Sequence, residues 1–288
     1  MKSIVVPGAK AAAQGWSNAP NDSLWKSPLE ATVTVSPSAE PGAGVEPVSP
    51  AGSALQLAEN SRQGDRAAAR IALVMFSATP HEAFGSAPLV VGVDEAGRGP
   101  LAGPVVAAAV ALCKPRPAGL DDSKKLCAAT RGQLDLSIRR RCAWGVGVVE
   151  VEEIDRLNIF GATMLAMTLA VARLAEAIAR EPDEVLVDGN LTPHGRRPEW
   201  RWSARAIVGG DAKEPAISAA SIVAKEWRDR MMIAAAREHP NYGWERNKGY
   251  GTADHMAALR THGPTPLHRR SFAPVAQCEL PFTAVPAE

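Results

Sequence analysis

The sequence predicts an α/β fold in which a mixed sheet is flanked by helices. Short apolar runs bounded by glycine and proline recur between residues 89 and 211, and such runs are typical of buried strands. Two longer segments, 161–180 and 217–238, carry apolar residues at helical spacing. Strands and helices mixed along one chain in this way favour a single sheet with helices on its faces.

The expected strands form two groups. The apolar runs 89–97 and 104–112 are separated by a short Gly/Pro-rich connection, which indicates neighbouring strands of a hairpin. Further strands are expected over 142–151, 184–190 and 203–211.

The helices differ in how far they are expected to be buried. Residues 124–141 predict a polar helix, whereas 161–180 is apolar nearly all round and predicts a mostly buried one. Residues 217–238 predict an amphipathic helix. One or two short helices are expected within 239–275, a segment rich in Gly, Pro and His.

The first part of the chain has a different composition. Residues 1–86 are rich in Pro, Ala, Ser and Gly without a sustained period, so we predict disorder, with one short helix near 62–76. A natural start at Met75 is an alternative interpretation. The predicted organisation is an extension over 1–86, an α/β domain over 87–238, a helical subdomain over 239–275 and a flexible tail over 276–288.

Composition excludes several classes of protein. The net charge of +1 does not by itself indicate a strongly charged binding partner. No apolar run approaches the ~20 residues of a membrane helix and the start is a poor signal peptide, so we expect a cytoplasmic protein without a membrane partner. The cysteines lack metal-ligand spacing, which argues against a zinc site. They are Cys113, Cys127, Cys142 and Cys278.

Acidic residues end three of the expected strands: Asp94 with Glu95, then Asp188, then Asp211. An ionised carboxylate beside a core is costly unless it is paired or binds metal. Mg²⁺ prefers such oxygen ligands, and two ions about 4 Å apart can activate water for phosphodiester hydrolysis. Taken singly, Asp188 could form a turn with Gly189 and Asp211 could cap a helix. The set of four favours a metal site.

A glycine-rich loop follows the first carboxylates and contains Gly97, Arg98, Gly99 and Gly103. Bare backbone there lets main-chain groups approach a ligand closely. A dinucleotide-binding loop is excluded because the spacing is GxGxxxG and the residues from Pro104 onward predict a strand rather than a helix. A Walker A loop is excluded because no GK[ST] follows.

The chain closely resembles the ribonuclease HII family in long, rare blocks. They are VDEAGRGPLAGPVVAAAV at 93–110, DDSKKL at 121–126, EIDRLNIFGATMLAM at 153–167, VLVDGN at 185–190, GGDAKEPAISAASIVAKEWRDR at 209–230, HPNYGW at 239–244, KGYGT at 248–252 and PLHRRSF at 266–272. Ribonuclease HIII is similar but carries a lysine in the glycine loop, where this chain has Arg98.

The resemblance implies a ribonuclease H-like fold and a nuclease. It implies that Asp94, Glu95, Asp188 and Asp211 hold two Mg²⁺ or Mn²⁺ ions. The implied reaction cuts RNA in RNA–DNA hybrids and nicks duplex DNA 5′ of embedded ribonucleotides, a role in ribonucleotide excision repair. The implied products carry 3′-hydroxyl and 5′-phosphate ends, and we expect a monomer.

The resemblance also implies the substrate contacts. Gly97, Arg98 and Gly99 look like the backbone that reads the ribose 2′-hydroxyl. Tyr250 looks like the tyrosine that stacks on the sugar at the RNA–DNA junction. Ser123 and Lys124 look like phosphate contacts.

Two further segments suggest nucleic-acid binding from their own composition. The loop 191–202 combines Arg196, Arg197 and Arg201 with Trp200 and Trp202, so it could grip nucleic acid by charge and stacking; the alternative is a solvated hairpin with both tryptophans folded onto the body. Residues 241–275 hold more basic than acidic side chains and predict a phosphate-binding surface; the alternative is an ordinary solvated face. The basic residues are Arg246, Lys248, Arg260, Arg269 and Arg270, with His255, His262 and His268 in the same segment.

Near the end of the chain, Gln277, Leu280 and Phe282 resemble the short peptide by which bacterial repair enzymes dock on the sliding clamp. Leu280 and Phe282 would fill an apolar groove and Gln277 would hydrogen-bond at its rim. An inert tail is the alternative. For the protein as a whole, another nuclease of the same fold or a non-catalytic nucleic-acid-binding protein are the competing hypotheses.

Overall fold

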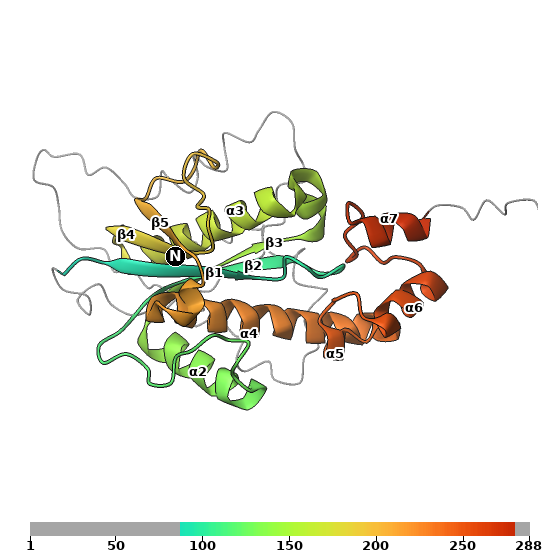
Figure 1. The fold of residues 1–288 in the computed structure, drawn as a ribbon, viewed down its shortest axis with the longest axis horizontal. Coiled ribbons are helices and arrows are strands. Elements are labelled where there is room, and N and C mark those ends of the chain that lie inside the picture. Colours follow the sequence, from blue (N-terminus) through green and yellow to red (C-terminus); the bar gives the residue numbers. More distant parts are fainter. Residues whose placement is uncertain (1–86, 280–288) are drawn as a thin grey trace, which may run out of the picture. The chain divides into compact units, whose positions relative to one another are not determined.

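A computed structural model describes residues 87–279 of the protein (Figure 1). The predictions made for the extension over 1–86, including the helix near 62–76 and the start at Met75, lie outside the described residues. Leu280 and Phe282 also lie outside them.

The predicted mixed sheet is confirmed, with five strands in the order β3-β2-β1-β4-β5. β1 pairs antiparallel with β2, and β2 antiparallel with β3, whereas β1, β4 and β5 run parallel. The strands are β1 Val90–Ala96, β2 Val105–Ala111, β3 Ala143–Val149, β4 Glu184–Asp188 and β5 Ala204–Ile207.

Helices cover both faces of the sheet (Figure 1). α3 (Val151–Ile178) covers one face; α4 (Pro215–Glu238) covers the other and packs against α2 (Ala128–Arg141). β2 is buried throughout, and its residues alternate between the two hydrophobic clusters, as expected for a strand covered on both faces. Its partner β3 lies so close to α3 that a Cβ added at Gly147 would meet the Ala166 carbonyl oxygen at 2.0 Å.

The predicted start of α3 is wrong by ten residues, because the helix begins at Val151 rather than at 161. The backbone leaves helical geometry at Asn158, where φ is 59°. The Asn158 Oδ1 atom accepts hydrogen bonds from the backbone N–H groups of Phe160 (2.9 Å) and Gly161 (3.0 Å). It therefore caps the second, apolar part of the helix, which is the part that the hydrophobic pattern identified.

α3 also corrects the expectation that the chain has no segment long and apolar enough for a membrane helix. Within the part of the chain that the structure describes, α3 alone meets that criterion by length and composition. Its apolar residues pack against the sheet in one hydrophobic cluster, which is how a core helix buries them.

Short helices form the C-terminal subdomain. They are η4 Pro240–Tyr242, α5 Trp244–Asn247, α6 Ala253–His262 and α7 Ala273–Glu279. Their buried side chains Tyr242, Trp244, Leu259 and Val275 belong to a third cluster, together with Met232 of α4. The first residues of the expected tail, 276–279, belong to α7.

Candidate active site

Asp94 and Asp188 end neighbouring parallel strands, β1 and β4. Val93 pairs with Val187, so the two aspartates follow directly at the same edge of the sheet. Both valines pack in the cluster beneath α3. Because side chains alternate along a strand, the two aspartates project to the opposite face, toward α4. Sheet register thus brings together two carboxylates that lie 94 positions apart.

Asp211 reaches the same place through the short helix η3 (Gly210–Ala212) that follows β5. The Gly210 N–H donates to Asp188 Oδ1 at 2.7 Å, which ties the two strand ends together. The helix-cap alternative for Asp211 is wrong: the N-cap of α4 is Glu214, and no side chain caps that helix end. Asp188 accepts its hydrogen bond from a distant strand end, so it does more than form a turn.

Three of these carboxyl groups have raised pKa values. Burial, then the charges of Glu95 and Asp188, holds the pKa of Asp94 well above its usual value. Burial also raises the pKa of Glu95, against the lowering effect of Arg98. For Asp211, burial and then the charge of Asp188 raise the pKa. The raised pKa values mean that ionising these neighbouring groups costs free energy.

Only partial charge compensation is available around them. Arg98 Nη1 lies 3.3 Å from Glu95 Oε1, and the exposed Lys124 Nζ lies 4.0 Å from Asp211 Oδ2. The Ser221 hydroxyl lowers the pKa of Asp94 by hydrogen bonding. Among residues 87–279, these contacts leave Asp94 and Asp188 without an ion-pair partner.

The donor chemistry fits hard divalent cations. All four groups are carboxylates, the ligands that Mg²⁺ and Mn²⁺ prefer, and a bound cation would offset the burial and the repulsion that raise the pKa values of Asp94, Glu95 and Asp211. Among residues 87–279, no three His, Cys, Asp or Glu side chains converge closely enough to ligate a single ion. The carboxylates therefore share an edge of the sheet without forming a closed cage.

Two buried arginines hold the glycine loop. Arg269 is fully buried, and its guanidinium donates to five backbone carbonyls, those of Gly97, Arg98, Pro100, Gly103 and Pro104. Arg228, 1% exposed, donates to the carbonyls of Ala102, Pro104 and Lys248. Burial lowers the pKa of Arg228 to about 10 and that of Arg269 to about 9.

The predicted phosphate-binding surface over 241–275 is therefore wrong for its buried members. Arg269, His255 and His268 are at most 1% exposed. The sequence offered one signal of a different role, since Arg269 lies in the PLHRRSF block that is part of the resemblance. Composition alone could not separate a buried arginine from a surface one.

Tyr250 lies beside the glycine loop. A Cβ built on Gly99 would lie 3.5 Å from the Tyr250 Cε1 atom, and the tyrosine is 47% exposed. Two backbone hydrogen bonds join the loop to this part of the chain, from Leu101 N to Gly249 O and from Gly103 N to Leu267 O, both 2.8 Å. The tyrosine ring and the loop backbone therefore face the same space.

A buried chain of rings supports Tyr250 from behind. The Trp244 indole N–H donates to His255 Nε2 at 3.1 Å, and His255 Nδ1 lies 2.9 Å from the Tyr250 carbonyl oxygen. His255 Nε2 also lies 3.0 Å from His268 Nε2, and His268 Nδ1 accepts from Thr265 N at 2.9 Å. Burial lowers the pKa of His255, and burial with the neighbouring histidines lowers that of His268 to about 3. Both rings are neutral at pH 7.

Ser123 and Lys124 lie near the carboxylates but differ in exposure. Ser123 is buried, and its hydroxyl hydrogen-bonds with Ser221 at 2.8 Å, so only its backbone is left for a phosphate. Lys124 is exposed. Arg131, which sequence reasoning missed, supports this turn by donating to the carbonyls of Ser123 and Leu126, both at 3.2 Å.

The loop 191–202 does not offer its tryptophans for stacking. Trp200 and Trp202 are 6% and 4% exposed, their rings meet edge to face at 5.1 Å, and the Trp200 indole donates to the Trp202 carbonyl at 2.8 Å. Arg201 donates to Glu181 at 2.7 Å and lies over the Trp202 ring. The tryptophans are folded onto the body, as the alternative predicted, although the loop contains no strand pairing.

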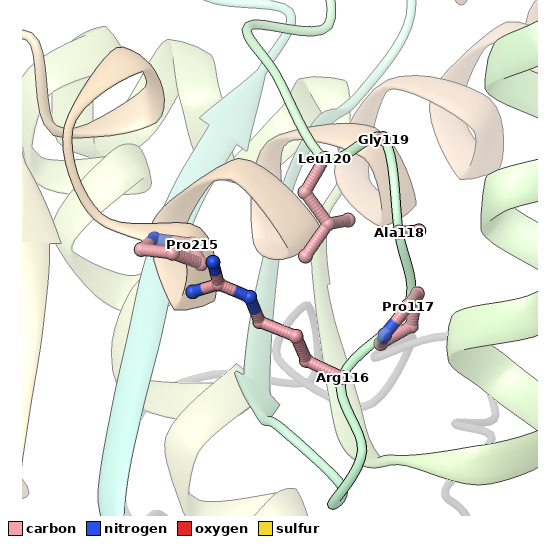
Figure 2. A pocket seen from close by; sticks show the side chains of 6 residues that line it. All are labelled: Arg116, Pro117, Ala118, Gly119, Leu120 and Pro215. Atoms are coloured by element: carbon pink, nitrogen blue, oxygen red, sulfur yellow. The ribbon is translucent and has the colours of Figure 1, made fainter.

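A pocket of about 360 Å³ lies between residues 116–120 and Pro215, the first residue of α4. Figure 2 shows the Arg116 side chain extending between the two segments. None of the predicted site residues lines this pocket.

Known proteins share this sequence and fold. The ribonuclease HII family model matches residues 91–275. Ribonuclease HII of Novosphingobium aromaticivorans is 76% identical over 194 residues, which are 67% of this chain and 99% of the relative. Ribonuclease HII of Erythrobacter litoralis is 68% identical over 210 residues, 72% of this chain and 99% of the relative.

Two solved structures resemble the fold. The ribonuclease H2 from Pyrococcus horikoshii OT3 has 25% identity and a TM-score of 0.53, covering 66% of this chain and 96% of that one. Bst-RNase HIII in complex with Mn²⁺ has 21% identity and a TM-score of 0.57, covering 69% of this chain and 71% of that one, and shows the fold alone. The chain therefore belongs to the ribonuclease HII family and is a hydrolase of the ribonuclease H class.

Proposed function

We propose that the protein cuts the RNA strand of RNA–DNA hybrids and nicks duplex DNA 5′ of embedded ribonucleotides. The observation that carries this proposal is the juxtaposition of crowded, incompletely compensated carboxylates at one sheet edge with a glycine loop held by buried arginines. The first feature suits metal-dependent phosphodiester hydrolysis, and the second suits close reading of a sugar.

Asp94, Glu95, Asp188 and Asp211 would hold two Mg²⁺ or Mn²⁺ ions. Bound there, the ions would supply an activated water and stabilise the leaving oxygen. The Gly210 N–H, which donates to Asp188 Oδ1, orients one carboxylate. The Ser221 hydroxyl, which hydrogen-bonds with Ser123, steadies Asp94 on the other side.

Binding of the duplex would fall to groups around this edge. The backbone of Gly97, Arg98 and Gly99 would meet the ribose 2′-hydroxyl, the group that separates RNA from DNA. The half-exposed Tyr250 ring would lie against the neighbouring sugar, and Lys124 with the Ser123 backbone would meet phosphates. Recognition of a single ribonucleotide in this way would serve ribonucleotide excision repair by a monomer.

A labelled DNA duplex with one ribonucleotide tests the proposal, with an all-DNA duplex as control and EDTA against Mg²⁺ or Mn²⁺. We expect one metal-dependent nick 5′ of the ribonucleotide, with 3′-hydroxyl and 5′-phosphate ends. Asp94→Asn should slow it greatly, whereas Asp254→Asn, at an exposed carboxylate of α6, should not. Cleavage of the all-DNA duplex, or no cleavage by folded protein with either metal, would refute the proposal.

Docking on the sliding clamp stays a separate proposal. Gln277 is exposed on α7, which suits a hydrogen bond at the rim of a groove. Binding of purified clamp to the wild-type protein, compared with Leu280→Ala/Phe282→Ala, tests it. Equal binding by both proteins, or none by either, would leave the tail without this role.

A further inference from the structure

The carbonyl groups of the glycine loop share one direction. Those of Gly97 and Arg98 both point at the Arg269 guanidinium, at 2.6 and 3.1 Å. Apart from the Lys114–Pro115 bond, the peptide bonds of the described residues are trans. In a trans peptide the N–H points opposite to the C=O. The N–H groups of Arg98 and Gly99 must therefore point away from Arg269.

Those two N–H groups are free to serve a ligand. Within residues 87–279, neither amide donates a hydrogen bond to another group of the protein. Arg98 and Gly99 are exposed, and the Tyr250 ring lies next to Gly99. Two adjacent N–H donors beside an aromatic ring suit a sugar hydroxyl oxygen, which accepts hydrogen bonds while the sugar packs on the ring.

We propose that Arg269 is the positioning residue for ribose recognition: by holding the carbonyls of Gly97 and Arg98, it turns the N–H groups of Arg98 and Gly99 toward the substrate. This inference rests on the proposed function and adds to it the group that orients the loop. Arg269 itself touches no substrate.

The geometry requires an arginine at this position. A planar guanidinium presents five N–H donors in a fixed fork, and here they reach five carbonyls of one loop. A lysine would bring charge but only three donors from a single nitrogen. The buried Arg228 also holds the loop, through the carbonyls of Ala102 and Pro104, and its side chain leaves no room for a Cβ at Gly97, which would lie 2.0 Å from Arg228 Nε.

The decisive measurement compares affinity for ribose with affinity for deoxyribose. Fluorescence anisotropy, with Ca²⁺ in place of Mg²⁺ so that nothing is cut, gives Kd for a duplex with one ribonucleotide and for the all-DNA duplex. We expect Arg269→Lys to reduce the ratio of the two Kd values about tenfold, because the loop loses its fixed hydrogen-bonded orientation. Affinity for the all-DNA duplex should change little.

A structural control separates positioning from general loss of stability. Ile138→Ala removes a fully buried side chain from α2, in a cluster without loop residues, and should lower stability while keeping the wild-type ratio. An unchanged ratio in folded Arg269→Lys would overturn the inference. A wild-type protein that fails to prefer the ribonucleotide would instead refute the proposed function.

Hydrogen exchange of the wild-type protein without substrate needs no variant at all. If Arg269 preorganises the loop, the segment 97–103 should behave as one conformation, with a single exchange rate for each amide. The exposed amides of Arg98 and Gly99 should still exchange quickly. The amides of Leu101 and Gly103, which donate to the C-terminal segment, should exchange as slowly as those of β1. Fast exchange at Leu101 and Gly103 would overturn the inference even if every Arg269 variant failed to fold.

Discussion

The carboxylate edge and the glycine loop handle buried charge in opposite ways. At the edge, burial and then neighbouring carboxylates raise the pKa values of Asp94 and Asp211, with little cationic support. In the loop, Arg228 and Arg269 are buried cations, and no ion pair among residues 87–279 includes either of them. Their charge is met mainly by backbone carbonyl dipoles, and the Arg269 guanidinium also lies over the Phe272 ring, 5.2 Å from its centroid.

The difference indicates which region has its interaction partners within the folded chain and which region needs a ligand. The arginines have their hydrogen-bond partners, so the loop has a defined shape before substrate arrives. The carboxylates keep an unfavourable concentration of charge that a bound cation would offset. The glycine loop therefore adds stability to the fold without metal, whereas the carboxylate edge lowers that stability and can bind metal.

The largest effect should come from Asp94→Asn, which removes a carboxylate from the edge. Loss of about 4 kcal/mol of metal-based stabilisation would lower the cleavage rate roughly 1000-fold. In EDTA the variant should be more stable than wild type, by about 1 kcal/mol, because a repelled buried charge is gone. Thermal denaturation with and without Mg²⁺ measures the change in stability, and the cleavage assay measures the change in rate. Lower stability in EDTA would break the comparison.

Arg269→Gln tests the opposite region and should have the opposite sign. It leaves buried carbonyls of the loop without donors, so the free energy of unfolding should fall by about 3 kcal/mol or more. Urea denaturation in EDTA gives this value directly. Arg260→Gln, at an exposed position of α6, should stay within about 0.5 kcal/mol of wild type and serves as control. Comparable losses for both variants would show that burial of Arg269 contributes nothing.

Acid should weaken the support behind Tyr250. The pKa of His268 in the folded protein is lowered to about 3. Between pH 6.5 and pH 3 the unfolded chain therefore binds more protons than the folded protein, and the free energy of unfolding decreases as the pH is lowered. From pH 6.5 to pH 5 this costs about 2 kcal/mol. The raised pKa values of Asp94 and Asp211 act in the opposite direction over the acidic range, because protonation there relieves the folded state.

Measuring urea stability against pH for wild type and His268→Gln isolates the histidine contribution. The variant should be less stable at pH 7, yet the gap between the two proteins should shrink by about 2 kcal/mol at pH 5. Parallel pH profiles would show that His268 does not titrate in this way.

The smallest effect is expected outside both regions, in the loop 191–202. Because Trp200 and Trp202 are buried and Arg201 pairs with Glu181, changing Arg196, Arg197 and Arg201 together to Ala should alter Kd for an RNA–DNA hybrid less than about threefold. Anisotropy at two salt concentrations measures it. A tenfold loss of affinity would show that this loop is a third binding region. It would support the hypothesis that the loop binds nucleic acid through the charge of its arginines.

Much of the fold followed from hydrophobic patterning. Strand alternation and long apolar runs located the sheet and both long helices. The missed boundaries depend on local backbone geometry: the pattern located the part of α3 that Asn158 caps, but not the turns of helix that precede the kink at Asn158. After β5, the left-handed backbone at Gly209 and the short helix η3 that follows it end the strand at Ile207, earlier than its composition suggested.

By itself, the sequence determined the carboxylate set, the glycine loop and the family, because these depend on residue types in a fixed order. Tertiary structure alone decided which charged side chains are buried and what they contact. Arg269 and Arg270 are adjacent and identical in type, yet one is buried among loop carbonyls and the other is exposed. The cause is the antiparallel bridge between Ala102 and His268, which places Arg269 beneath a loop more than 160 positions earlier in the chain. No local pattern encodes such a contact.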